Sequence, residues 1–134
     1  IKILSESGWE IGSHGLTHVA FTSLPDEALK IELEQSKRIL EDVIEKEVIS
    51  ITPPFSRWNN HVKDLSLKCG YKKIYYQHSF SFKSNDSLFP RHSIYSIDSK
   101  SSILRKLNNS KMEIIKELII HNCSTLTMLV KEIL

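Results

Sequence analysis

The stretch that decides the fold is residues 8–18, which read Gly-Trp-Glu-Ile-Gly-Ser-His-Gly-Leu-Thr-His. Residues 9–12 alternate in polarity, as the residues of a short strand do. A polar loop follows at once, and it contains His14 and His18. The stretch therefore predicts a short strand that leads directly into a histidine-bearing loop.

Helix and strand signals alternate along the rest of the chain. The strongest helix signal runs from about residue 25 to 46, with apolar residues at helical spacing, Ser23 as its cap and acidic residues in its first turn. Four charged residues of this helix are expected to face water: Glu32, Glu34, Lys37 and Glu41. The other predicted elements are helices over 1–8, 59–70, 101–107, 111–121 and 125–134, strands over 48–51, 74–76 and 94–97, and a polar loop over 77–90.

This order of elements predicts the fold class. Helices that lie between short apolar strands are typical of parallel βα units. A full (β/α) barrel needs roughly 200 residues or more, whereas this chain has 134. We therefore predict an α/β fold that forms part of a (β/α) barrel and has a helical C-terminal tail. A chain of this length can bury one core, so residues 1–134 are taken as a single domain.

The composition excludes several classes of protein. Apolar residues make up 40% and charged residues 25%, as in globular rather than disordered proteins. The net charge of +2 does not predict a nucleic-acid partner, and no apolar run approaches the ~20 residues of a membrane helix. Cys69 and Cys123 are expected to be free thiols. With no visible signal segment, they favour a cytoplasmic over a secreted protein.

The two histidines are candidate metal ligands. Imidazole is a common ligand for zinc, and two rings four positions apart can reach one ion if the loop makes a single helical turn. The pattern differs from the zinc-protease helix, because position 15 is Gly and not the Glu that serves as base there. Two solvated loop histidines remain the alternative.

A second candidate segment follows the strand predicted over residues 48–51. It reads Thr-Pro-Pro-Phe-Ser-Arg-Trp-Asn over residues 52–59. The carboxyl end of a strand is where α/β proteins gather ligand loops, and exposed aromatic rings suit the wall of a sugar site. The alternative is a structural turn with Phe55 and Trp58 packed inwards.

Taken together, the two segments resemble the second and third motifs of NodB-type polysaccharide deacetylases, carbohydrate esterase family four. The second motif of that family reads roughly Gly-His-Glu-Ile-Gly-Ser-His-Thr-x-x-His, and the third is a proline-rich turn that resembles residues 51–55. Residues 69–72, Cys-Gly-Tyr-Lys, and residues 89–91, Phe-Pro-Arg, resemble later parts of the family pattern. The resemblance covers about residues 4 to 98. It makes residues 1–98 the family portion and residues 99–134 the helical tail.

The resemblance implies an activity and residue roles. The activity is metal-dependent hydrolysis of N- or O-acetyl groups on a polysaccharide or an N-acetylated sugar precursor. His14 and His18 would hold a divalent metal, with Zn2+ as the first choice. Pro54, Phe55 and Trp58 would shape the substrate site, and Arg91 would pair with a catalytic Asp.

The sequence departs from the family pattern at several positions. Nothing in it matches the first motif, a Thr-Phe-Asp-Asp-like segment that holds the catalytic base and the third metal ligand. Thr52 stands where many members carry Arg, and Gly15 stands where many carry Ser or Thr. His121 is expected to end a helix rather than to act as catalytic acid. We expect these 134 residues alone to have negligible deacetylase activity.

Two other functions stay open from the sequence. The chain could be a carbohydrate-binding pseudo-enzyme module that keeps a sugar groove without catalysis. It could also be a related amidohydrolase that acts on a small amide. An incomplete barrel would expose a strand edge and apolar surface, so a homo-oligomer is also expected.

Overall fold

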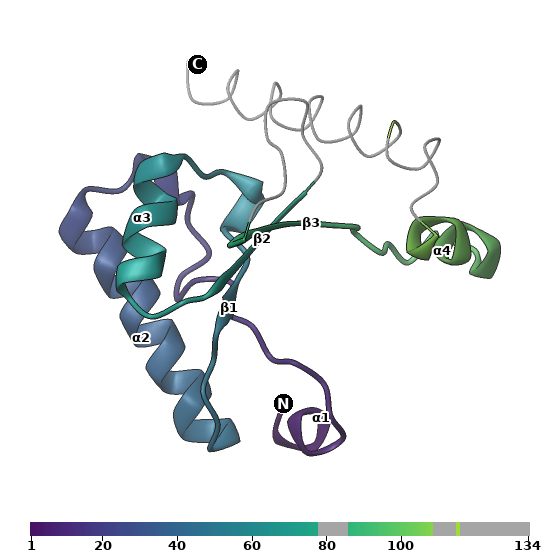
Figure 1. Ribbon diagram of the computed structural model, residues 1–134, viewed down its shortest axis with the longest axis horizontal. Helices are drawn as coiled ribbons and strands as arrows, with labels where there is room; N and C mark the ends of the chain where they lie inside the picture. The colour runs from purple at the N-terminus through teal and green to yellow at the C-terminus, as the bar shows by residue number, and fades with distance from the viewer. Residues whose placement is uncertain (78–85, 109–114, 116–134) are drawn as a thin grey trace. The chain divides into compact units, whose positions relative to one another are not determined.

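The computed structural model describes residues 1–77, 86–108 and 115 (Figure 1). The chain divides into two compact units, the first comprising residues 1–76 with 85–89 and the second comprising the remainder. The helices predicted over 111–121 and 125–134 lie outside the described residues, except that residue 115 is helical. Among the helices described, none is long and apolar enough to cross a membrane.

Parallel βα units form the first unit, as the sequence predicts. The α-helices and strands occur in the order α1 (Lys2–Glu6), α2 (Asp26–Ile44), β1 (Ser50–Ile51), α3 (Asn60–Lys68), β2 (Lys73–Gln77), β3 (Leu88–Arg91) and α4 (Lys100–Leu107), and short 3-10 helices lie at Phe21–Ser23 and Pro54–Ser56. β1 pairs with β2 in parallel, Ser50 opposite Lys73 and Ile51 opposite Ile74, and β3 lies beside β2. In Figure 1, α2 and α3 lie on the same side of β1. The α/β class is therefore confirmed.

Local signals predict the helix ends correctly, with one exception. Asn59 caps α3 by accepting a hydrogen bond from the Val62 N–H at 2.9 Å, and Gly70 follows that helix with a φ of 89°. Ser23 does not cap α2, because its hydroxyl donates to the Ala20 carbonyl in the preceding turn. The cap position of α2 is Pro25, which has no side-chain hydrogen bond.

The core of the first unit is built from buried apolar residues of α2, α3 and the strands. The largest fully buried apolar side chains in these elements and beside them are Phe21, Leu29, Leu33, Val48, Ile51, Val62, Tyr71 and Ile74. Lys37 connects α2 to the segment that enters β1, since its ammonium donates to Glu41 and to the Val48 carbonyl, each at 2.6 Å. The helical pattern predicts that Lys37 and Glu41 face water, but their side chains are 14% and 31% exposed.

The strand predicted over residues 9–12 is wrong. Only Ser13 joins the sheet, through a parallel bridge to Ile51. Before Ser13, the backbone completes the end of α1, because the Trp9 N–H donates to the Leu4 carbonyl. The strand predicted at this point is thus reduced to one residue, the one directly before His14.

The strand predicted over residues 94–97 is also wrong. Those residues form a turn in which the Asp98 N–H donates to the Tyr95 carbonyl and the Asp98 carboxylate accepts from the Tyr95 N–H. Ile94 and Ile97 are 62% and 92% exposed, so their apolar character does not reflect burial. A strand is present instead at β3, which begins inside the segment predicted as a loop over residues 77–90 and ends one residue beyond it.

We predict that Lys106 controls the titration of Asp98. The hydrogen bond from the Lys106 ammonium, 2.7 Å long, is the main cause that lowers the pKa of Asp98 from 3.8 to about 2. Stabilisation by this pair is therefore present above pH 3.8 and is lost as the pH falls through about 2. In Lys106→Met, carbon-detected NMR should show the Asp98 midpoint rising towards 3.8.

The matched control for that measurement is Lys100→Met, which removes an exposed lysine from the start of the same helix. It should leave the Asp98 midpoint unchanged. An unchanged midpoint in Lys106→Met would contradict the assignment of the pKa shift to the Lys106 hydrogen bond.

Candidate metal centre

The rings of His14 and His18 lie side by side in the loop that follows Ser13, the residue bridged to Ile51. Their ring centroids are 5.0 Å apart, with an angle of 63° between the ring planes. His14 Nδ1 lies 2.6 Å from the Thr52 carbonyl oxygen, which can only accept a hydrogen bond. Nδ1 therefore carries the proton and donates, and the lone pair of the neutral ring is on Nε2. This tautomer is the one that a metal-binding histidine adopts when a backbone carbonyl orients it.

The loop brings the rings together through left-handed residues rather than through the single helical turn that the sequence suggested. Gly15 has a φ of 83° and His18 a φ of 59°. The Gly15 N–H donates to the Ser13 hydroxyl at 3.1 Å, which tightens the turn around His14. Of these two left-handed residues, His18 is the one with a Cβ, so its backbone is strained. Strain of this kind is commonly found at functional sites.

Thr52 contributes its main chain to the site. Its N–H donates to the Ser13 carbonyl at 2.9 Å, and its own carbonyl accepts from His14. The contact therefore does not depend on the side chain at position 52, where many members of the resembling family carry Arg. This departure from the family pattern leaves the orientation of His14 intact.

Glu32 is the residue of the site that sequence reasoning missed. It was expected to face water, but it is 5% exposed. Its carboxylate accepts hydrogen bonds from the Leu16 N–H at 2.7 Å, the Thr17 N–H at 3.0 Å and the Thr17 hydroxyl. Burial alone would raise the pKa of Glu32, but the hydrogen bonds from Thr17 and Leu16 outweigh it, so the pKa is lowered. A charged Glu32 thus lies beneath the loop that carries the histidines.

A chain of buried hydroxyl groups connects the same loop to α2 and to Tyr71, which lies two residues before β2. The Ser13 hydroxyl donates to Ser36 at 2.8 Å, and the Ser36 hydroxyl donates to the Glu32 carbonyl at 2.6 Å. The Tyr71 hydroxyl donates to the Leu33 carbonyl at 2.9 Å, and burial raises the pKa of Tyr71. α2 therefore contacts the loop both before His14 and after it.

The proline-rich turn places one aromatic ring beside the histidines and another in the core. The Phe55 ring centroid lies 4.8 Å from that of His18, and Phe55 is 41% exposed with a φ of 57°. Trp58 is 8% exposed and packs against Tyr76 at 5.6 Å between ring centroids. Trp58 therefore follows the alternative of an inward-packed ring, because it lies in the core, whereas Phe55 is exposed. Pro54 is also buried, and the substrate roles of Pro54, Phe55 and Trp58 stay predictions.

A family model described as polysaccharide deacetylase matches residues 1–74, more than half of the chain. The chain belongs to the polysaccharide deacetylase family. None of the curated proteins compared matches this member.

Solved structures share the fold of this chain. The Streptococcus pyogenes deacetylase PplD in complex with acetate is 19% identical, with a TM-score of 0.67 over 78% of this chain and 47% of that one. The polysaccharide deacetylase BC0361 from Bacillus cereus is 20% identical, with a TM-score of 0.65 over 79% of this chain and 34% of that one. A mutant of BA3943, a CE4 family pseudoenzyme with restored enzymatic activity, is 14% identical, with a TM-score of 0.55 over 87% and 46%. The chain thus spans less than half the length of these proteins.

Two side chains of this chain could serve as metal ligands. His14 and His18 offer two imidazole rings, and the hydrogen bond of His14 leaves its Nε2 available as a ligand. Within residues 1–77, 86–108 and 115, no group of three metal-ligating side chains is present. The described donor set therefore fits two of the ligands of a metal ion, and a third protein ligand would have to come from outside these residues.

Arg91 ends β3 and belongs to the second unit. Its Nη1 donates to the Ser93 hydroxyl at 3.3 Å. The pairing of Arg91 with a catalytic Asp, which the family resemblance implies, stays a prediction.

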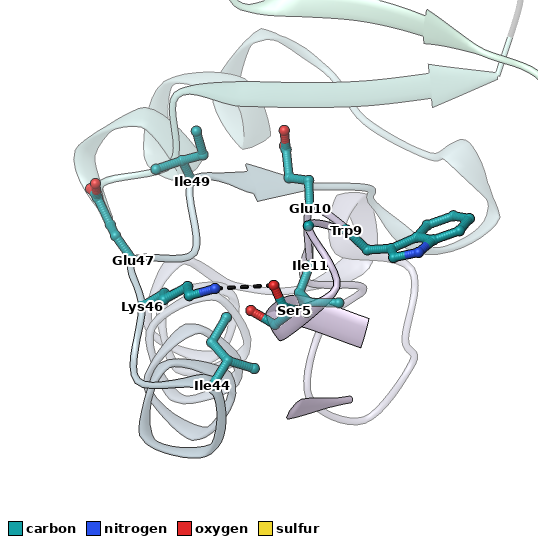
Figure 2. Close-up of a pocket in the computed structure, with 9 residues that line it drawn as sticks. Ser5, Trp9, Glu10, Ile11, Ile44, Lys46, Glu47 and Ile49 are labelled. Atoms are coloured by element: carbon teal, nitrogen blue, oxygen red, sulfur yellow. Dashed lines mark hydrogen bonds between the residues drawn. The ribbon is translucent and has the colours of Figure 1, made fainter. Parts of the chain in front are cut away.

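A pocket of about 260 Å³ lies apart from the histidines, at the start of the strand segments (Figure 2). Its wall includes Glu10 and Ile11, which precede Ser13, and Ile49, which precedes β1. His14 and Thr52 follow those same strand segments. At one side of the pocket, the Lys46 ammonium donates to the Ser5 carbonyl at 3.0 Å, as Figure 2 shows. The pocket is not part of the candidate metal centre.

Proposed function

We propose that this chain forms the two-histidine portion of a metal-dependent deacetylase that removes acetyl groups from a polysaccharide or an N-acetylated sugar precursor. The observation that carries the proposal is the His14 ring, held by the Thr52 carbonyl with its Nε2 free and with the His18 ring 5.0 Å away. Family membership supplies the reaction class. When bound, a divalent cation such as Zn2+ polarises a carbonyl oxygen and lowers the pKa of water.

Residues of this chain orient the two histidines and offer a surface to the substrate. The Thr52 carbonyl fixes the tautomer and the orientation of His14. The edge-on contact between Phe55 and His18 limits the rotation of the His18 ring. Because Phe55 is half exposed beside that ring, it offers an apolar surface for the methyl group of an acetyl substituent.

The experiment that tests the proposal is calorimetric titration of the 134-residue chain with Zn2+ and, in parallel, with Mg2+. We expect Zn2+ to bind with one ion per chain and Mg2+ to give no binding, because imidazole nitrogen suits zinc whereas magnesium prefers oxygen ligands. No binding of Zn2+, or equal binding of both ions, would contradict the proposed site.

Activity is tested separately from metal binding. A longer chain that includes the Asp motif of the family should release acetate from chitooligosaccharide in a metal-dependent way, and the 134 residues alone should not. Release by this chain alone would show that the two histidines suffice. Hydrolysis of small amides but not of chitooligosaccharide would favour a related amidohydrolase instead.

A second candidate is a carbohydrate-binding module without catalysis. It is favoured by the donor set, because the part of the chain that the structure describes offers a histidine pair and no third metal ligand beside it. In that case glycan binding would be unchanged in His14→Ala. Under the first proposal, binding of an acetylated glycan would depend on added Zn2+ and would fall in the variant.

A further inference from the structure

We propose that Glu32 is a positioning residue that holds His14 and His18 side by side from beneath their loop. The inference rests on the proposed metal site for its functional meaning. Its structural part, the placement of the two rings, can be tested without metal.

Both oxygens of the Glu32 carboxylate are used by the loop. Oε2 accepts from two consecutive backbone groups, the N–H of Leu16 at 2.7 Å and the N–H of Thr17 at 3.0 Å, and Oε1 accepts from the Thr17 hydroxyl. Leu16 and Thr17 are two of the three residues that separate the histidines. The direction of the backbone that carries His18 is therefore set by this carboxylate.

A buried carboxylate is costly unless hydrogen bonds compensate for the lost solvation. Glu32 is 5% exposed, and its pKa is nevertheless lowered, because the loop supplies such bonds. A charged acceptor is also the group that makes the strongest hydrogen bonds to backbone N–H groups. The loop therefore stabilises the buried carboxylate through hydrogen bonds, and the carboxylate in turn fixes the conformation of the loop.

The same helix holds the loop on the other side of His14. One turn along α2 from Glu32, the Ser36 hydroxyl accepts from the Ser13 hydroxyl at 2.8 Å. The Ser13 hydroxyl also accepts from the Gly15 N–H. Hydrogen bonds therefore hold the loop both before and after His14. The three hydrogen bonds to Glu32 are the ones next to His18.

The first test uses the metal-free chain. In the wild type, nuclear Overhauser effects between the ring protons of His14 and His18 should be present, since the ring centroids are 5.0 Å apart. In Glu32→Gln, which keeps the size of the side chain but has one acceptor oxygen fewer, these effects should weaken or vanish. The amide signals of Leu16 and Thr17 should shift, and the core signals should stay.

The matched control is Glu34→Gln. Glu34 lies on the same helix and is exposed, and its contact with Lys30 is 3.8 Å long. The substitution removes the same charge and should leave the histidine contact unchanged. If Glu32→Gln does not fold, Thr17→Val removes only the hydroxyl hydrogen bond and should produce a smaller change in the same signals. Ring contacts that persist unchanged in the folded Glu32 or Thr17 variant would overturn the proposal.

The second test connects the position of the rings to metal binding. Titration with Zn2+ should show an affinity about 10-fold or more lower in Glu32→Gln than in Glu34→Gln, comparable to the effect of losing a residue that orients a ligand. Wild-type affinity in Glu32→Gln would overturn the functional part of the inference. If the wild type binds no Zn2+, the proposed function fails, whereas the ring contacts still decide whether Glu32 positions the histidines.

Discussion

Replacing His14 with alanine is expected to abolish measurable Zn2+ binding in calorimetry. The variant keeps one imidazole, and a single neutral ligand in water does not compete with the hydration of the ion. Loss of a residue that only supports a ligand costs about 10- to 100-fold in metal affinity, so loss of the ligand itself should exceed that range. Folding should survive, because the substitution removes one hydrogen bond to the Thr52 carbonyl, about 1 kcal/mol at an exposed position.

The control for this prediction is His61→Ala. It also removes one imidazole, but His61 lies on α3, is exposed and pairs with Asp26 at 2.9 Å. Its variant should bind Zn2+ as the wild type does. Equal binding by the wild type and His14→Ala would show that the ion binds elsewhere and that the histidine pair is not the metal centre. Equal loss in both variants would point to nonspecific binding by histidines.

The parts of the fold that could be predicted from the sequence depend on neighbouring residues. Asn59 determines the start of α3 through its side-chain cap and Gly70 determines its end through a left-handed backbone, so the identity of each residue is enough. The strands were less predictable, because a strand requires a partner that the sequence does not name. Ile94 and Ile97 have the composition of a strand, yet the carboxylate of Asp98 turns the chain there.

The histidine pair was predictable and its support was not. The spacing of His14 and His18 after an apolar segment pointed to a shared site, and the structure brings the rings together. Glu32 follows the periodicity of an exposed helix position. What buries it is a loop 15 residues away that folds back over α2 and offers two N–H groups. A periodic pattern describes one helix and contains no information about what covers it.

Gly15→Ala is expected to destabilise the chain by about 2–5 kcal/mol, through a backbone cost and a packing cost. Gly15 has a φ of 83°, where a residue with a Cβ costs roughly 1–2 kcal/mol. A Cβ at this position would also meet the Phe21 ring at 3.0 Å and Glu32 Oε2 at 3.1 Å. Both neighbours are buried, so their displacement adds about 1–3 kcal/mol. Urea unfolding followed by circular dichroism measures the change.

Gly8→Ala separates the two contributions. Gly8 has a φ of 90°, and no atom lies within 4 Å of the position that a Cβ would occupy, so its variant carries the backbone cost alone. If Gly15→Ala is no more destabilising than Gly8→Ala, the packing against Phe21 and Glu32 is not tight. If it is more destabilising by the expected margin, then Ser or Thr, which many members of the family carry at the matching position, should be tolerated no better than Ala. The glycine would then belong to the same arrangement as the buried Glu32, since the carboxylate approaches the loop where a side chain at position 15 would otherwise be.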